Sequence, residues 1–507
     1  MKHIKKLASL LLALVMVFAL ATTAFAEETT YSITINNSAK DHTYEAYQIF
    51  TGDLSGTTLS NIVWGSGVSE AGQTALGDAA AKAETLKNEA DAKAFAKAVA
   101  PYLTTAAGSA NTVTDGKYVI SGLAAGYYLV KDQDGSLTGD NDSYTEYIIQ
   151  VVGNVTATPK SDVPEVQKKV KDINDSTDTT KTGWQDSADY DIGDSIPFQL
   201  KATLADNVSS YTTYKVVFHD TLSKGLTYNN DAKVYIDGTE TNGFTVTADG
   251  TTTLTVSCDD VKALGAGNSS VITVEYTAKL NENAVLGSAG NPNEVYLEYS
   301  NNPNKSETGD NETGNTPKDV AIVFTYKTII NKVDGENQPL TGAAFKLEKL
   351  IKGKDGAEDT WTTVKEFTVD ETITSFTFSG LDDGRYKLTE TKTPAGYNTI
   401  DPIYFVIEAT HDETADAPAL KTLNAYLTDV NGNKQTEMKE GESVNIDLGT
   451  VDLTAGSITT TVVNKSGSEL PSTGGIGTTI FYVLGGVLVL AAVVLLVTKK
   501  RMSGAEK

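Results

Sequence analysis

Short runs that alternate apolar and polar residues fill most of the chain and end at Gly, Asn or Asp, the pattern of β-strands with one buried face. In the first region, residues 27–160, we expect strands at 31–36, 44–50, 117–121, 126–131 and 144–158. Residues 70–103 break this pattern. They are rich in Ala, Lys and Glu, and Phe95, Val99 and Leu103 recur every four residues, which predicts helix. The first region is therefore predicted to be a β-domain with a helical insertion.

Two more β regions follow. Residues 161–304 are almost entirely short alternating runs separated by turn residues, as in a sandwich of two sheets. Residues 305–318 are polar and are predicted to be a linker, and residues 319–466 form a third β region. At roughly 100–200 residues per domain, the length also suggests three domains. We therefore predict an all-β chain of tandem sandwiches.

Strand alternation places three polar side chains inside the second region: Lys168, Asp220 and Asn293. Apolar residues share their faces, namely Val166, Val170, Val216, Phe218, Val295 and Leu297. A buried charge without a partner is very costly, so we expect these three groups to meet. A shifted register would instead bring in Lys169, Asn291 or Asn301.

The third region repeats this pattern. Lys332 follows Ile330 on one face, Glu390 follows Leu388, and Asn464 follows Val462. Considered as residues alone, each set could be a buried ion pair with an Asn hydrogen bond, or a reacting group of amine, acid and amide.

Both ends of the chain carry targeting segments. A basic start, an apolar stretch at 7–20 and the small residues Ala24 and Ala26 predict a signal peptide at 1–26, cleaved between Ala26 and Glu27. A transmembrane helix is predicted at 476–498, because this run is long, apolar and uncharged, and the basic tail at 499–507 is expected in the cytoplasm. Directly before this helix stand Leu470, Pro471, Ser472, Thr473, Gly474 and Gly475.

This order of motif, apolar helix and basic tail resembles the cell-wall sorting signal of Gram-positive surface proteins. The resemblance implies that a class A or class C type of sortase, a membrane cysteine transpeptidase, cleaves between Thr473 and Gly474. The acyl end of Thr473 then passes to an amine. The resemblance therefore implies that the protein is secreted, held briefly in the membrane and then anchored to peptidoglycan on the cell surface.

The third region carries a second resemblance, in the runs Ile330-Asn-Lys332, Leu340-Thr-Gly-Ala-Ala-Phe-Lys-Leu347, Tyr386-Lys-Leu-Thr-Glu390 and Pro394-Ala-Gly-Tyr397. They resemble collagen-adhesin B-type domains, which are immunoglobulin-like sandwiches of inverse topology. Residues 122–132 match residues 380–390 in frame, so the first and third domains look like divergent repeats. Together with the run 163–170, the mature chain is similar to backbone pilins, the shaft subunits of covalent pili.

The family likeness implies self-formed Lys–Asn isopeptide bonds assisted by a buried acid. Carried onto this sequence, Lys168 would join Asn293 with Asp220 as the acid, and Lys332 would join Asn464 with Glu390 as the acid. Burial favours a neutral amine and a protonated acid, and fixed proximity then allows amide exchange without a cofactor.

The first domain departs from this pattern. Asp132 stands at the acid position, but Asn37 stands where the lysine belongs, so we expect no cross-link of this kind there.

Polymerisation also needs an acceptor amine. Backbone pilins use a lysine in a short Pro-Lys motif after their first domain, which here is Lys160 in Thr158-Pro159-Lys160. The same tripeptide occurs at Thr316-Pro317-Lys318, which makes Lys318 the rival. Identical subunits are then the main partners, with minor pilins as optional ones.

Charge and composition narrow the function further. Outside the signal peptide and the segment after Thr473, 34 basic and 65 acidic residues remain, a net charge of −31, which argues against nucleic acid as a partner. Cys258 is the one cysteine, so no internal disulfide can form. We find no metal-ligand spacing, no cofactor motif and no nucleophile–base set, so a turnover enzyme is disfavoured. The alternative to a shaft subunit is a wall-anchored adhesin or tip pilin that binds a host or matrix ligand.

Overall fold

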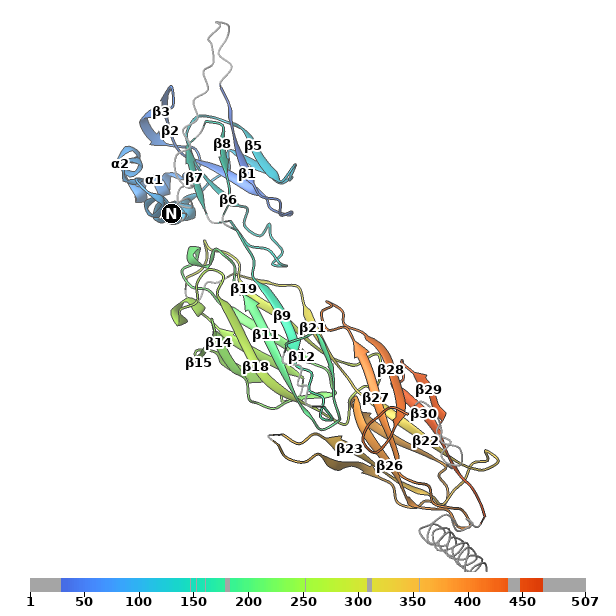
Figure 1. Cartoon of the computed structure of the whole chain (residues 1–507). Coiled ribbons are helices and arrows are strands. Elements are labelled where there is room, and N and C mark those ends of the chain that lie inside the picture. Colours follow the sequence, from blue (N-terminus) through green and yellow to red (C-terminus); the bar gives the residue numbers. More distant parts are fainter. Residues whose placement is uncertain are drawn as a thin grey trace, which may run out of the picture.

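Three β-sandwiches lie end to end and form an elongated rod in the computed structural model (Figure 1). The structure describes residues 29–467 apart from 146, 152, 160, 178–182, 251, 308–311, 355 and 436–446. Each sandwich has its own apolar core between two sheets, and the first also packs a second small core against its helices. The predicted all-β architecture of tandem sandwiches is therefore confirmed.

The first sandwich pairs a three-stranded sheet, in the order β5-β1-β8, with a sheet in the order β3-β2-β6-β7, and β4 adds to β2. Its strands are β1 (Tyr31–Asn36), β2 (Tyr44–Ser55), β3 (Thr58–Trp64), β4 (Gly108–Ala110), β5 (Lys117–Leu123), β6 (Tyr127–Asp132), β7 (Ile148–Val151) and β8 (Val155–Ala157). The single strand predicted at 144–158 is thus two short strands in different sheets.

The predicted helical insertion is present, but it is divided into three helices and a short 3-10 turn. These are α1 (Glu70–Leu76), α2 (Ala79–Thr85), α3 (Glu89–Val99) and η1 (Ala100–Tyr102). The side chains of Asp78 and Asn88 accept hydrogen bonds from the first turns of α2 and α3, so each starts a new helix. Phe95 on α3 then stacks on Phe50 of β2, with ring centroids 5.4 Å apart.

The second sandwich packs a sheet in the order β10-β21-β19-β12-β17-β16 against one in the order β15-β14-β18-β11-β9. The first contains β10 (Ser187–Asp189), β12 (Val216–Leu222), β16 (Thr245–Ala248), β17 (Thr253–Cys258), β19 (Asn291–Ser300), β20 (Thr313–Asn315) and β21 (Asp319–Phe324). The second contains β9 (Glu165–Val170), β11 (Ser195–Thr203), β13 (Leu226–Tyr228), β14 (Lys233–Ile236), β15 (Thr239–Thr241) and β18 (Val271–Leu280). Two 3-10 turns lie in its loops, η2 (Val208–Ser210) and η3 (Val261–Leu264).

The third sandwich packs a sheet in the order β25-β22-β30-β29 against one in the order β24-β23-β26-β27-β28. Its strands are β22 (Tyr326–Asp334), β23 (Ala344–Ile351), β24 (Thr360–Glu366), β25 (Ser375–Leu381), β26 (Gly384–Lys392), β27 (Ile403–His411), β28 (Leu420–Thr428), β29 (Asp447–Asp452) and β30 (Ser457–Asn464). Its first and last strands, β22 and β30, run parallel side by side, with Lys332 opposite Val462.

Two strands lie in the second sandwich although the sequence places them elsewhere. Strand β20 falls in the predicted linker at 305–318, and β21 falls at the start of the predicted third domain at 319–466. Both β20 and β21 pair with β19, and β21 also pairs with β10. Strand pairing within the second sandwich therefore extends to Phe324, and one residue separates β21 from β22 of the third sandwich. Such short, hydrogen-bonded connections limit the freedom of one sandwich relative to the next.

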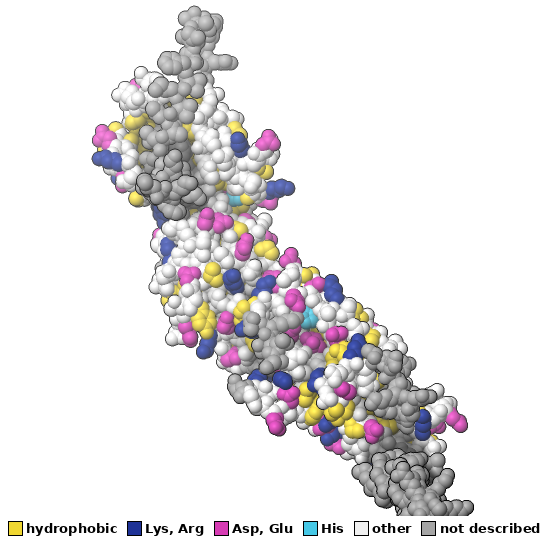
Figure 2. All heavy atoms as spheres, viewed as in Figure 1, with side chains coloured by type: hydrophobic (Ala, Val, Ile, Leu, Met, Phe, Trp, Pro, Cys, Tyr) yellow, Lys and Arg dark blue, Asp and Glu magenta, His cyan; other side chains and the backbone are white. Residues whose placement is uncertain are grey.

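Acidic and basic side chains are interspersed along the visible face of the rod, without a continuous basic stripe (Figure 2). Within the described part of the chain, no helix is both long and apolar enough to cross a bilayer. The transmembrane helix predicted at 476–498 and the signal peptide at 1–26 lie outside the described residues.

Candidate functional site

Lys168, Asp220 and Asn293 meet inside the second sandwich, around the hydroxyl of Tyr276. The Lys168 Nζ donates to Asp220 Oδ1 and to the Tyr276 hydroxyl, each at 2.7 Å. The same hydroxyl donates to Asp220 Oδ2 and accepts from Asn293 Nδ2 at 2.7 Å. Lys168 and Asn293 are completely buried, so amine, acid and amide share a dry cluster centred on one phenol oxygen.

The two sheets contribute equally to this cluster. Lys168 on β9 and Tyr276 on β18 come from one sheet, while Asp220 on β12 and Asn293 on β19 come from the other. Alternation explains the placement, because each residue takes an inward position between apolar neighbours on its strand. The cluster therefore forms only when the two sheets pack together.

Burial sets the protonation of the second-sandwich cluster. Desolvation lowers the pKa of Lys168 to about 8, even though the Asp220 carboxylate beside it acts in the opposite direction. Desolvation likewise raises the pKa of Asp220, opposed by the charge of Lys168. Both shifts favour the neutral amine and the neutral acid. Asn293 Oδ1 is buried without a hydrogen-bond partner, so its carbonyl is not held by another donor.

The alternative registers place their residues elsewhere. Lys169 forms an ion pair with Asp186 on the other face of β9. The Asn291 amide donates to the backbone oxygens of Val285 and Val323. Asn301 donates to Asp142 of the first domain. The structure thus brings together the set predicted from the primary register.

Lys332, Glu390 and Asn464 meet inside the third sandwich without an intervening side chain. The Lys332 Nζ donates to Asn464 Oδ1 at 2.6 Å, and Asn464 Nδ2 donates to both carboxylate oxygens of Glu390, at 3.0 and 3.1 Å. The ammonium nitrogen lies 3.9 Å from Glu390 Oε1. The amide thus bridges amine and acid, with its carbonyl toward the amine and its nitrogen toward the acid.

Here the amine and the amide come from neighbouring strands of one sheet, β22 and β30, and the acid reaches across from β26 in the opposite sheet. Lys332 and Asn464 are completely buried. Desolvation lowers the pKa of Lys332 to about 8, with the nearby Glu390 acting in the opposite direction. Glu390 is held in place by the Thr393 hydroxyl, which donates to its Oε2 at 3.0 Å.

The first sandwich has a buried acid but a different partner. Asp132 Oδ1 lies 2.8 Å from His42 Nδ1, and its Oδ2 accepts from the backbone N–H of Thr145 at 2.6 Å. Asn37, which stands at the lysine position, donates to the Tyr44 hydroxyl at 2.8 Å. Among the described residues near Asp132 the amine is thus replaced by an imidazole, which suits a buried hydrogen-bond network.

The residues expected to act in assembly are described only in part. Lys160 and the motif 470–475 lie outside the described residues, as do Ala26 and Glu27 at the signal cleavage position. The rival Lys318 is described: its side chain is 64% exposed and its Nζ lies 3.0 Å from Glu294 Oε2.

Two residues that sequence reasoning missed belong to buried polar clusters. Tyr276 follows Ile272 and Val274 on the inward face of β18, so its position indicated burial, although an aromatic residue there suggests ordinary core packing. Lys349 is nearly completely buried against Asp191 and Asp382. A shift of register between Leu347 and Glu348 in the pairing with β24 breaks the alternation that would have identified it.

Three family models match separate parts of the chain. A Gram-positive pilin backbone subunit 2, Cna-B-like domain matches residues 192–303, a SpaA-type prealbumin-like fold domain matches residues 327–419, and the LPXTG cell wall anchor motif matches residues 462–503. These ranges include much of both buried clusters and the predicted sorting signal.

Relatives and solved structures agree with these matches. The trypsin-resistant surface T6 protein of Streptococcus pyogenes serotype M6 is 28% identical over 448 residues, which cover 76% of this chain and 77% of that protein. The T6 backbone pilin structure from the same serotype has a TM-score of 0.56 at 17% identity, covering 88% of this chain and all of that one. The full-length major pilin SpaD of Corynebacterium diphtheriae has a TM-score of 0.50 at 19% identity, covering 88% and 99%. At these identities the structures establish the shared fold.

Proposed function

We propose that this chain is a sortase-assembled major pilin, anchored to the Gram-positive cell wall as a subunit of the pilus shaft, and that its second and third sandwiches each carry one self-formed Lys–Asn isopeptide bond. The observation that carries the proposal is the third-sandwich cluster. There an amine of lowered pKa lies 2.6 Å from an amide oxygen, and the amide nitrogen lies on a buried carboxyl group.

In the third sandwich the neutral amine of Lys332 attacks Cγ of Asn464. A C–N bond forms between Lys332 Nζ and that carbon, and the bond from Cγ to Nδ2 breaks. Glu390 contacts the leaving nitrogen and can relay to it the proton that the amine loses, so one ammonia leaves and no oxidant or cofactor is needed. Because the groups are already in contact, proximity replaces a bimolecular encounter.

The second sandwich supports the same reaction between Lys168 and Asn293, with Asp220 as the acid. Tyr276 touches all three groups, so it can hold amine and amide near each other and relay a proton to or from Asp220. Either bond converts a meeting of two strands into a covalent link. We therefore assign the clusters to mechanical and proteolytic resistance of the shaft.

For assembly, we propose that sortase cleaves between Thr473 and Gly474 and joins Thr473 to Lys160 of the next subunit. Two neighbours support this choice: Thr158 is exposed and Pro159 is half-buried, so the chain reaches the surface directly before Lys160. Lys318 is also exposed, which keeps it as the rival, but its amine is paired with Glu294.

Two measurements test the proposal. The mature protein should weigh two ammonia less than its sequence, with one loss in each of the second and third domains. In wall extracts, wild type and Lys318→Ala should both give a ladder of SDS-resistant multimers, whereas Lys160→Ala should give a single band. A branched peptide joining Thr473 to Lys160 should appear in digested polymer. A ladder in Lys160→Ala would overturn the acceptor assignment, and a single wild-type band would favour a directly anchored adhesin.

A further inference from the structure

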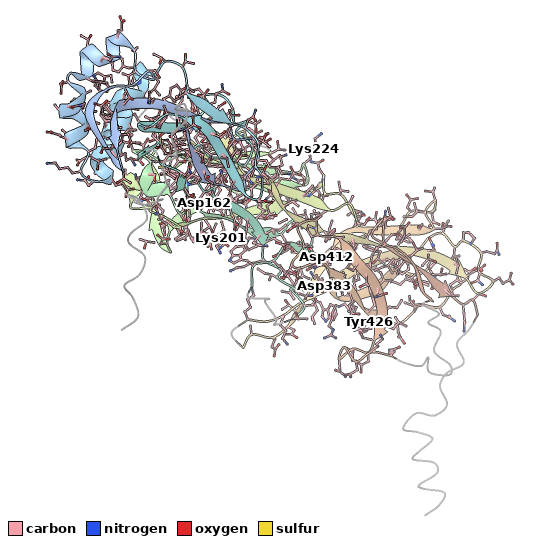
Figure 3. The ribbon with its side chains drawn as sticks, turned by 90° about the horizontal axis from the view of Figure 1, so that it is seen from above. Asp162, Lys201, Lys224, Asp383, Asp412 and Tyr426 are labelled. Carbon is pink, nitrogen blue, oxygen red and sulfur yellow. The ribbon has the colours of Figure 1, made fainter. Side chains whose placement is uncertain are left out.

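The junction between the second and third sandwiches holds an unusual number of buried and half-buried carboxylates. They are Asp172, Asp175, Asp189, Asp191, Asp194, Asp382 and Asp383. Asp383 is labelled in Figure 3, where the two sandwiches meet. We call this cluster the acidic junction. Among the described residues, few basic side chains contact its carboxylates. Lys349 is the lysine that enters it, and His411 borders it on one side.

Three of these carboxylates converge from both sandwiches. Asp189 ends β10 in the second sandwich, while Asp382 and Asp383 lie in the turn between β25 and β26 of the third. One oxygen from each lies within 4.8 Å of the others. Oxygens bound to Ca²⁺ lie roughly 2.3–2.6 Å from it, so two ligands on opposite sides of the ion are about 4.6–5.2 Å apart. The three oxygens therefore fit around a single ion of that size.

Buried oxygens without hydrogen-bond partners point to a ligand at this position. Asp189 and Asp382 are 2% and 0% exposed, yet Asp189 Oδ2 and Asp382 Oδ1 have no well-formed hydrogen bond. The Tyr326 hydroxyl is also buried and makes only a weak hydrogen bond to Asp189, and its pKa is raised by burial and by the nearby aspartates. Leaving such groups unpaired is costly, and a cation would satisfy the two carboxylate oxygens together.

The neighbouring side chains hold these carboxylates in fixed orientations. Lys349 Nζ donates to Asp382 Oδ2 at 3.0 Å, on the other side of the carboxylate from the unpaired oxygen. Asn174 Nδ2 donates to Asp383 Oδ1. His411 Nε2 lies 3.9 Å from Asp189 Oδ1, which again leaves Oδ2 directed elsewhere. Groups that bind the outer oxygens of ligating carboxylates are typical of metal sites.

We propose that Asp189, Asp382 and Asp383 bind one hard divalent cation of the Ca²⁺ class between the second and third sandwiches. All the ligands are oxygens, which is the preference of Ca²⁺ rather than of thiophilic metals. The ion would join a strand of one sandwich to a turn of the next and so fix the angle between them. This inference does not depend on the isopeptide bonds.

The competing occupant is the proton. Burial, together with repulsion from neighbouring aspartates, raises the pKa of Asp189 and Asp382 well above the usual range, although Lys349 opposes this for both residues. Two other groups of three in the same junction are competing sites: Asp175, Asp191 and Asp194, and Asp172, Asp189 and His411. Of the three groups, the proposed one contains both Asp189 and Asp382, the two aspartates here that have a buried oxygen without a well-formed hydrogen bond.

The test uses the mature chain after chelator treatment and titrates it with CaCl₂ alone, by isothermal titration calorimetry. We expect one Ca²⁺ per chain, and a melting temperature that rises with Ca²⁺. Asp382→Asn and Asp383→Asn should each weaken binding by roughly tenfold or more. Asp194→Asn, from a competing group, is the matched control and should retain binding. His411→Gln removes a neighbour of Asp189 and should weaken binding less than Asp382→Asn does.

Asp383→Asn keeps the test informative if Asp382→Asn fails to fold. Asp383 is only half-buried, so its variant should retain the wild-type fold, which circular dichroism checks. Absence of Ca²⁺ binding in wild type would overturn the proposal in favour of a protonated junction. Loss of binding in Asp194→Asn or His411→Gln, with retention in Asp382→Asn, would move the ion to a competing group and also overturn it. The ammonia losses should be unchanged throughout, so failure here is distinct from failure of the cross-links.

Discussion

The second and third sandwiches bring the same three chemical groups together by different geometries. In the third, the amine of Lys332 touches the amide of Asn464 directly, from neighbouring parallel strands of one sheet. In the second, Lys168 and Asn293 lie in opposite sheets, and both contact the Tyr276 hydroxyl. The comparison shows that the strands on which the lysine and the asparagine lie, more than the residue types, decide how closely amine and amide approach.

The difference also changes what each bond would tie. A link between Lys332 and Asn464, which are 132 positions apart in the sequence, would join the first and last strands of the third sandwich. Tension applied to the two ends of the sandwich would then pass through the link and not through the residues between them. A link between Lys168 and Asn293 would join one sheet to the other through the core. Because Lys168 lies on the first strand of the second sandwich and Asn293 on one of its last, this link would also carry tension past most of that sandwich, and it would tie the two layers to each other.

The largest expected effect is the loss of the proposed third-sandwich bond in Glu390→Gln. The amide cannot supply the proton, so the mass of residues 319–466 should show no ammonia loss. By analogy with a disulfide that closes a loop of this length, the free energy of unfolding should fall by about 5 kcal/mol. Thermal melting and trypsin digestion measure this. Exposed Glu366→Gln is the control, and an intact ammonia loss in Glu390→Gln would contradict the role of the acid.

Asp220→Asn should prevent the proposed bond in the second sandwich without affecting the third. The loop closed by Lys168 and Asn293 is slightly shorter, and the contacts of Tyr276 with both residues remain, so the folded domain should be less disturbed. We expect no ammonia loss for the second domain and an unchanged third domain, by mass of proteolytic fragments. Exposed Asp259→Asn should behave as wild type. Simultaneous loss of both bonds would mean that the two sandwiches do not react independently.

Tyr276→Phe tests the feature that separates the two clusters. Removing the hydroxyl deletes the hydrogen bonds that hold amine and amide together, which should slow bond formation roughly tenfold, as expected for about 1.4 kcal/mol. Freshly secreted protein should then contain a fraction without the second-domain ammonia loss, measured by mass spectrometry over time. Tyr296→Phe, on the outward face of β19, is the matched control. An unchanged rate of bond formation in Tyr276→Phe would mean that Tyr276 contributes only core packing.

The smallest effect concerns the protonation of Lys332 when it has no partner to react with. In Asn464→Ala the amine stays free, with a folded pKa of about 8 against an ordinary value of 10.5. Between these pH values the unfolded chain binds more protons than the folded one, so stability should rise as the pH increases from 8 toward 10.5. We expect a gain of about 5 °C in melting temperature. The double variant with Lys332→Met should lack this slope.

Much of both clusters followed from strand alternation. Lys168, Asp220 and Asn293 occupy inward positions on their strands, and so do Lys332, Glu390 and Asn464, because a period of two fixes which face a residue takes once the strand is recognised. Tyr276 was also on an inward face, but a tyrosine between apolar residues gives no sign of a polar role. The helical insertion follows from composition and periodicity, whereas its division depends on the capping hydrogen bonds of Asp78 and Asn88.

The sequence by itself determined the strand faces, the helical insertion and the identity of the buried polar residues, because these depend on local periodicity and on the cost of burying charge. Only the tertiary structure decided which sheet each strand joins. That choice places Lys332 beside Asn464 within one sheet, separates Lys168 from Asn293 by a tyrosine, and adds β20 and β21 to the second sandwich. The acidic junction around Asp189 and Asp382 likewise appears only when residues almost two hundred positions apart are packed together, since no local pattern links them.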